Sequence, residues 1–79
     1  MKTLMGIALC RQIPVRYYLL TEKRELCAYG VCVEYQDEMV EISRITPSRQ
    51  RIMALLRLLM NGCVTPVAVK DVVEDWLSV

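Results

Sequence analysis

The chain has 79 residues, enough for one domain near the size at which a single core is only marginally sufficient. Hydrophobic residues make up 54% of it, which argues against disorder, and its formal net charge of +1 creates no strong attraction to nucleic acid or to anionic membranes. Histidine is absent, which removes the usual general base, the commonest metal ligand and the usual pH switch.

Residues 4–10 are apolar and closely follow Lys2, which gives this segment a superficial likeness to a lipoprotein signal. The run is shorter than a typical signal core, and the bulky Leu9 stands where processing requires a small residue. No stretch approaches the roughly 20 apolar residues that cross a bilayer, so we expect no membrane partner. We interpret the segment as a β-strand, with an uncleaved signal as the alternative; the sequence leaves open whether residues 2–10 join the core sheet.

The four cysteines are Cys10, Cys27, Cys32 and Cys63, and none of their spacings matches a C-x-x-C motif. Without histidine, a zinc site would need all four thiolates or a carboxylate. Cys27 and Cys32 stand five apart in a strand-like run, so they face opposite sides unless a bulge at Gly30 intervenes. We expect buried, reduced cysteines, no metal or other cofactor, and a reducing, cytoplasmic setting.

Between residues 15 and 43, apolar side chains recur at every second position, and polar turns at residues 22–25 and 36–38 separate the runs. This period of two predicts an antiparallel meander with one buried face. The side chains assigned to the buried face are Val15, Tyr17, Leu19, Cys27, Tyr29, Val31, Val33, Tyr35, Val40 and Ile42. Those assigned to the opposite face are Arg16, Tyr18, Leu20, Ala28, Gly30, Cys32, Glu34, Met39, Glu41 and Ser43.

Two helices are predicted after the strands, over about residues 47–61 and 66–78. Thr46 and Thr65 each precede a proline, a pattern typical of a helix cap followed by the first helical position. Gly62 is expected to end the first helix in a left-handed conformation. The predicted fold is therefore α+β: one domain over residues 1–79, with an antiparallel meander of three to four strands over about residues 4–45, followed by two C-terminal helices packed on one face.

The charges on the two helices oppose their dipoles. Arg49 and Arg51 fall in the first turn of one helix, while Glu74 and Asp75 fall near the end of the other. A short link makes the helices antiparallel neighbours, so these groups could compensate each other as exposed ion pairs. The alternative is two separately solvated ends.

Residues 52–60 form the most apolar part of the chain, with eight apolar side chains out of nine. A surface helix needs only one apolar stripe, so this helix is either deeply buried or shared with a partner. Leu58 lies outside the main stripe, and Tyr18 and Leu20 share the outward face of their strand. The sequence thus predicts a symmetric homodimer, with Leu58, Tyr18 and Leu20 as its candidate interface.

No catalytic motif accompanies these elements. Ser43, Ser48 and the cysteines have no histidine to activate them. The acidic residues between Glu34 and Glu41 lack the spacing of a calcium loop. We therefore expect that the protein is not an enzyme.

Several segments together resemble a known family. They are Tyr17-Tyr18-Leu19-Leu20-Thr21-Glu22, Tyr29-Gly30-Val31, Ile45-Thr46 with the leucine-rich helix, and Val64-Thr65-Pro66 leading to Asp71-Val72-Val73-Glu74-Asp75-Trp76-Leu77. Over about residues 14–77 the chain is similar to small uncharacterised bacterial proteins, a domain of unknown function found mainly in anaerobic Gram-positive bacteria. The resemblance implies a cytoplasmic protein without an assigned activity, and it carries no functional residues over to this chain.

Two functions remain for a chain of this kind. The leading one is a non-enzymatic, cytoplasmic protein-interaction or small regulatory module that self-associates and has an unknown protein partner. The alternative is a nucleic-acid-binding module that uses the sheet or an arginine surface, although nucleic acid is the less favoured partner. A contiguous basic surface joining Arg11, Arg16, Arg44 and Arg57 would favour the alternative, whereas dispersal or pairing with acids would favour the first.

Overall fold

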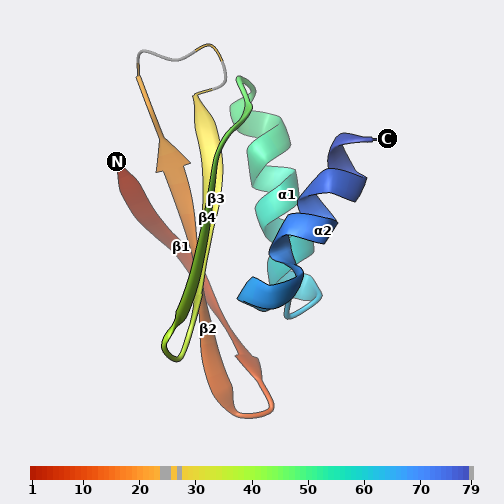
Figure 1. Ribbon diagram of the computed structural model, residues 1–79. Coiled ribbons are helices and arrows are strands. Elements are labelled where there is room, and N and C mark those ends of the chain that lie inside the picture. The colour runs from red at the N-terminus through yellow and green to blue at the C-terminus, as the bar shows by residue number, and fades with distance from the viewer. Residues whose placement is uncertain (24–25, 27, 79) are drawn as a thin grey trace.

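The computed structural model describes residues 1–23, 26 and 28–78, which form a four-stranded sheet followed by two helices (Figure 1). The strands are antiparallel and adjacent in chain order. Both helices lie on one face of the sheet, called here the inner face (Figure 1). The elements are β1 (Lys2–Cys10), β2 (Ile13–Thr21), β3 (Tyr29–Tyr35), β4 (Glu38–Thr46), α1 (Arg49–Asn61) and α2 (Pro66–Leu77).

This arrangement confirms the predicted α+β meander and settles its number of strands at four. Residues 2–10 do join the sheet, because β1 pairs with β2 from Lys2 opposite Leu20 to Cys10 opposite Ile13. Cys27, which was predicted to face the core, lies outside the described residues.

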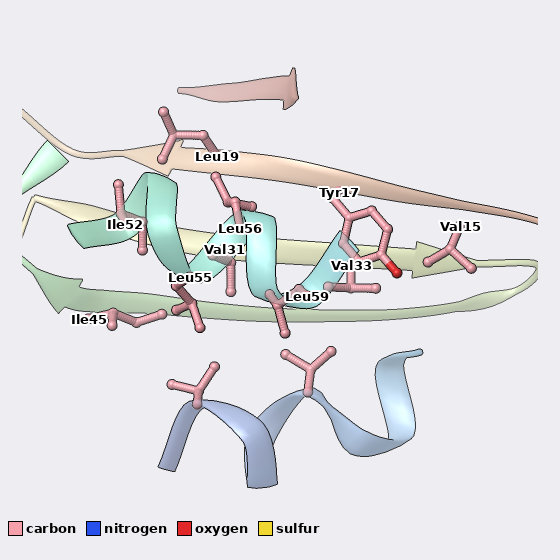
Figure 2. Close-up of a cluster of buried hydrophobic side chains, with 12 residues drawn as sticks. Val15, Tyr17, Leu19, Val31, Val33, Ile45, Ile52, Leu55, Leu56 and Leu59 are labelled. Carbon is pink, nitrogen blue, oxygen red and sulfur yellow. The ribbon is translucent and has the colours of Figure 1, made fainter. Parts of the chain in front are cut away.

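The strand register confirms the predicted buried face. Residues directly opposite each other on neighbouring strands point to the same side. Tyr17 pairs with Val33, and Val33 in turn pairs with Val40. From the helices, the fully buried side chains are Ile52, Leu55, Leu56 and Leu59 of α1 and Val69 of α2, with Val73 nearly so. Figure 2 shows α1 lying across the sheet with these leucines pointing into the same space as Tyr17 and Val33.

The β1–β2 turn consists of two residues in the left-handed region, Arg11 with φ 54° and Gln12 with φ 70°. Two successive positive φ angles are characteristic of the turn whose twist matches that of the flanking strands. Asparagine and glycine are the usual residues at these positions, and this chain has neither there. The turn therefore carries no strong signal in the sequence.

Each edge strand contains a bulge. In β1 the register shifts between Leu4 and Gly6, and in β4 the residues 43–45 lie opposite the single residue Gly30. Arg44, inside the second bulge, has a left-handed φ of 58°. A Cβ atom on Gly30 would meet the Ile42 carbonyl oxygen and lie 2.6 Å from the Ser43 Cα, so the close approach of β4 requires glycine.

The start of α1 differs from the prediction. The cap is Ser48, whose Oγ accepts a hydrogen bond from the Arg51 backbone N–H at 3.2 Å, and not Thr46. Thr46 ends β4 instead, and its Oγ1 accepts a hydrogen bond from the Ser48 N–H at 3.2 Å. The predicted start at residue 47, with Thr46 as the cap, was wrong because Ser48, two residues after Thr46, caps the helix instead. In α2 the prediction is confirmed, with Thr65 as the N-cap before Pro66.

The end of α1 also differs. Gly62 has a φ of −90°, and it is Cys63, one residue later, that takes the left-handed conformation with φ 49°. The Cys63 N–H donates to the Met60 carbonyl at 3.2 Å, and the Val64 N–H donates to the Leu59 carbonyl at 3.0 Å. These are the two bonds of a Schellman motif, in which the left-handed position normally belongs to glycine. The predicted left-handed glycine at position 62 was therefore wrong.

Candidate interaction surfaces

The outer face of the sheet, opposite the helices, has exposed apolar side chains along β1. Leu4 pairs with Tyr18, Ile7 with Arg16 and Leu9 with Pro14, so all three β1 residues share the face of Tyr18. Their exposed fractions are 48%, 53% and 68%. Leu20 lies on the same face, opposite Lys2. We call Leu4, Ile7, Leu9, Pro14, Tyr18 and Leu20 the outer apolar patch.

Strict alternation along the sequence would not find this patch. Leu4 has the opposite parity to Ile7 and Leu9, so a regular strand would point them to different faces. The bulge between Leu4 and Gly6 adds one residue and brings all three onto one side. The bulge is the physical reason that Leu4 shares this face with Ile7 and Leu9, which alternation along the sequence does not predict.

The patch borders an edge of the sheet. Within the described part of the chain, β1 pairs with β2 alone, along nine residues. An edge strand presents backbone N–H and C=O groups that can pair with another strand. The part of β1 beyond the bulge, which has Ile7 and Leu9 on one face, is thus suited to strand addition.

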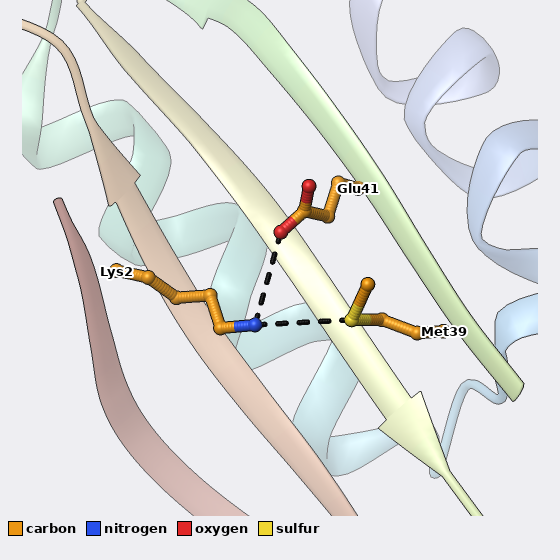
Figure 3. A network of polar contacts seen from close by, with 3 residues as sticks. All are labelled: Lys2, Met39 and Glu41. Atoms are coloured by element: carbon orange, nitrogen blue, oxygen red, sulfur yellow. Dashed lines mark hydrogen bonds and ion pairs between the residues drawn. The ribbon is translucent and has the colours of Figure 1, made fainter. Parts of the chain in front are cut away.

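The other half of the outer face, over β3 and β4, is polar. The Lys2 Nζ lies 3.8 Å from the Glu41 Oε2, 3.8 Å from the Met39 Sδ and 4.7 Å from the centre of the Tyr18 ring (Figure 3). Lys2 therefore extends from β1 over β2, and the side chains of Glu41 and Met39 extend from β4 to meet it. Cys32, which the register places between Tyr18 and Glu41, is fully buried, and this burial raises the pKa of its thiol while the Lys2 charge opposes the rise.

Leu58 lies on the other side of the molecule. It is 49% exposed and lines a groove of about 340 Å³ between α1 and α2, together with Val72, Asp75 and Trp76. The helices cover the inner face, whereas Tyr18 and Leu20 point outward from the sheet. The structure therefore does not bring the three predicted interface residues together, and one flat contact surface cannot include all of them.

The basic start of α1 and the acidic end of α2 do not form the ion pairs that the sequence suggested. Among the described residues, neither Arg49 nor Arg51 makes an ion pair with Glu74 or Asp75. The Arg51 guanidinium instead lies 4.7 Å from the centre of the Trp76 ring. A cation over an indole face is a favourable contact in its own right.

A family model described as "Family of unknown function (DUF6514)" matches residues 7–79. The chain belongs to the DUF6514 family. The match begins inside β1 and includes Ile7 and Leu9, so it extends further toward the N-terminus than the resemblance over residues 14–77. No curated protein and no solved structure matches the chain.

In this DUF6514 member, two of the cysteines meet at one end of the sheet. The Cys10 Sγ lies 3.4 Å from the Cys63 carbonyl oxygen, and the Cys63 Sγ lies 3.6 Å from the Leu9 carbonyl oxygen. A hydrogen bond with the Cys63 side chain, and then burial, raise the pKa of Cys10 to about 11. Sequence spacing gave no sign of this pair, because the two residues are 53 positions apart.

A contiguous basic surface that would favour nucleic-acid binding is not formed by Arg11, Arg16, Arg44 and Arg57, which lie on different elements of the DUF6514 fold. Arg16 pairs with Glu34 at 3.8 Å, and Arg44 pairs with Glu22 at 3.8 Å. Arg57 lies on α1, and Arg11 lies in the β1–β2 turn. Over the described residues, no three cysteine, aspartate or glutamate side chains gather as a metal site would require, and no helix is long and apolar enough to cross a membrane.

Proposed function

We propose that this protein is a non-enzymatic, cytoplasmic protein-interaction module that self-associates through the outer apolar patch and the edge of β1. The observation that carries the proposal is the exposure of Leu4, Ile7 and Leu9 side by side on an edge strand. Large contiguous apolar patches on small proteins mark interaction sites, and this one lies next to backbone groups that can pair with a further strand.

The geometry suits a second copy of the same chain. Two β1 strands that pair antiparallel are related by a two-fold axis, so each copy contributes the same patch. The product is a continuous sheet with four strands from each copy. Leu4, Ile7 and Leu9 from both copies then meet across the axis, and burying the exposed half of each should contribute roughly 1 kcal/mol per side chain.

Other surfaces support association less well. The groove at Leu58 offers one exposed leucine beside the charged Asp75. The dispersal of the four arginines and the pairing of Arg16 and Arg44 with glutamates argue for the interaction module over nucleic-acid binding. A role without catalysis is in keeping with the absence of histidine from the sequence.

The test is the oligomeric state of an Ile7→Lys variant in sedimentation velocity. Ile7 lies near the middle of β1 and is about half exposed, so a lysine there should leave the monomer fold intact. A charge buried at the two-fold contact should weaken the dimer by roughly 100-fold or more in Kd. Circular dichroism then checks that the fold is retained.

The matched control is Leu58→Glu, at a residue equally exposed but on the helical side. The proposal expects this variant to remain dimeric. A wild-type protein that is monomeric at high micromolar concentration would overturn self-association altogether. A Leu58→Glu variant that dissociates while Ile7→Lys stays dimeric would move the interface to the helices.

A further inference from the structure

We propose that Cys10 and Cys63 form a dithiol site that closes into a disulfide on reaction with a small-molecule disulfide, and so links β1 to the α1–α2 turn. The proposal is independent of self-association, because both cysteines belong to the same copy and lie in contact within it.

The first argument is the reciprocal contact of the two thiols. The Cys10 Sγ contacts the backbone of Cys63 at 3.4 Å, and the Cys63 Sγ contacts the backbone of the residue before Cys10, Leu9, at 3.6 Å. A disulfide needs its two sulfurs close together, and each sulfur here already lies against the backbone of the other cysteine or of its neighbour.

Cys63 also has an unusual backbone conformation. Its φ of 49° is the left-handed conformation that the end of α1 requires, where glycine is the favoured residue. A cysteine there is strained relative to glycine. At this position the Cys63 thiol lies 3.6 Å from the Leu9 carbonyl oxygen at the end of β1, a contact that glycine could not make.

Both thiols are also accessible to a small reagent from solvent. Both cysteines line a surface pocket of about 480 Å³, together with Leu9, Arg11, Tyr35 and Thr65. Each is only half-buried, whereas Cys32 is fully buried. The Arg11 guanidinium adds a positive charge to the rim, which suits an anionic reagent such as glutathione disulfide.

The reaction proceeds by two thiol–disulfide exchanges. The Cys63 thiolate attacks one sulfur of the small disulfide RSSR, so that a Cys63–S–S–R bond forms and RS⁻ leaves. Cys10 then gives up its proton to water and attacks the Cys63 sulfur, which forms the Cys10–Cys63 bond and expels the second RS⁻. Overall the two protein thiols are oxidised and one RSSR is reduced to two RSH. The raised pKa of Cys10 disfavours its thiolate, which is in keeping with Cys10 attacking second.

The test treats the reduced full chain with glutathione disulfide, blocks the remaining thiols with N-ethylmaleimide, and maps tryptic peptides by mass spectrometry without reduction. Trypsin places Cys10 in residues 3–11, Cys63 in residues 58–70, and both other cysteines in residues 25–44. The expected product is peptide 3–11 linked to peptide 58–70 within one copy. The oxidised protein should melt roughly 10 °C or more above the reduced one, because the bridge closes a long loop.

Variants separate the bridge from the backbone strain. Cys63→Gly should be at least as stable as the reduced wild type, since glycine suits the left-handed position, yet its melting temperature should not respond to the oxidant. Cys32→Ala, the matched control, should still form the bridge. Three results would overturn the proposal: a link that involves peptide 25–44, a bridge between two copies on a non-reducing gel, or glutathione that stays attached to Cys63 while Cys10 remains free.

Discussion

The two faces of the sheet are stabilised in different ways. On the inner face, Tyr17 and Val33 meet the fully buried leucines of α1, and the core is closed mainly by apolar packing. On the outer face Cys32 is just as deeply buried, but the register places it between Tyr18 and Glu41, beside the Lys2 ion pair. The inner face is buried because the two helices cover it. On the outer face, burial comes instead from long side chains that lie over neighbouring strands.

The largest expected effect is on the inner face. Leu56→Ala truncates a fully buried side chain on the side of α1 that faces the sheet. It should lower the free energy of unfolding by about 3–4 kcal/mol. Leu9→Ala, on the outer face, should cost less than about 1 kcal/mol when the protein is dilute enough to be monomeric. Urea denaturation of both variants checks the difference. Equal losses would mean that the outer patch belongs to the monomer core.

A second substitution should reverse that order. Gly30→Ala places a methyl group against the β4 backbone on the outer face, and the expected cost is about 3 kcal/mol. Gly6→Ala, on the inner face, meets only the end of the flexible Met60 side chain, whose sulfur lies 2.5 Å from the new Cβ position. It should therefore cost far less. Thermal unfolding distinguishes them, and a tolerant Gly30 position would contradict the close approach of β4.

Tyr17 tests a polar contact within the inner face. Its hydroxyl donates to the Val64 carbonyl at 2.9 Å, so Tyr17→Phe should cost about 1 kcal/mol, whereas Tyr18→Phe should cost nothing measurable. Burial raises the pKa of Tyr17 above its ordinary value of 10.0. The neutral form is thus favoured by folding, and its contribution is complete below pH 10 and is lost as the pH rises through the folded pKa. Urea titrations from pH 8 to pH 11 should show a smaller alkaline loss in Tyr17→Phe.

The smallest expected effect belongs to the ion pair on the outer face. Lys2→Met and Glu41→Gln should each cost less than about 1 kcal/mol, because both side chains are partly exposed and their charged atoms are 3.8 Å apart. A double-mutant cycle measures the coupling between them. A coupling above 2 kcal/mol would show that this network, and not only packing, stabilises the sheet.

The sequence predicts the core well because alternation depends only on local chemistry. The parity of Val15, Tyr17 and Leu19 gives the buried face of β2, and the structure places all three there. Where the local signal is ambiguous the prediction fails. Two capping residues, Thr46 and Ser48, stand near the start of α1, and the chain uses the second.

The candidate surfaces were harder to predict because they depend on contacts between distant segments. The sequence shows that Leu58 and Tyr18 point away from their own stripes, but not that they point to opposite sides of the molecule. The bulge that gathers Leu4 with Ile7 leaves no distinct residue pattern, and the meeting of Cys10 with Cys63 depends on the docking of α1 against β1. Such features follow from the assembled fold and not from any one element.

The meander topology also has a consequence for the time course of folding. The β1–β2 and β3–β4 hairpins close on two-residue turns, so each pair can form within microseconds at little cost in loop entropy. The bond from Tyr17 to Val64 joins residues 47 positions apart and requires α1 to be in place. We therefore expect the hairpins to be formed in the transition state and the helical layer to dock afterwards, with φ-values near zero at Val69 and Val73.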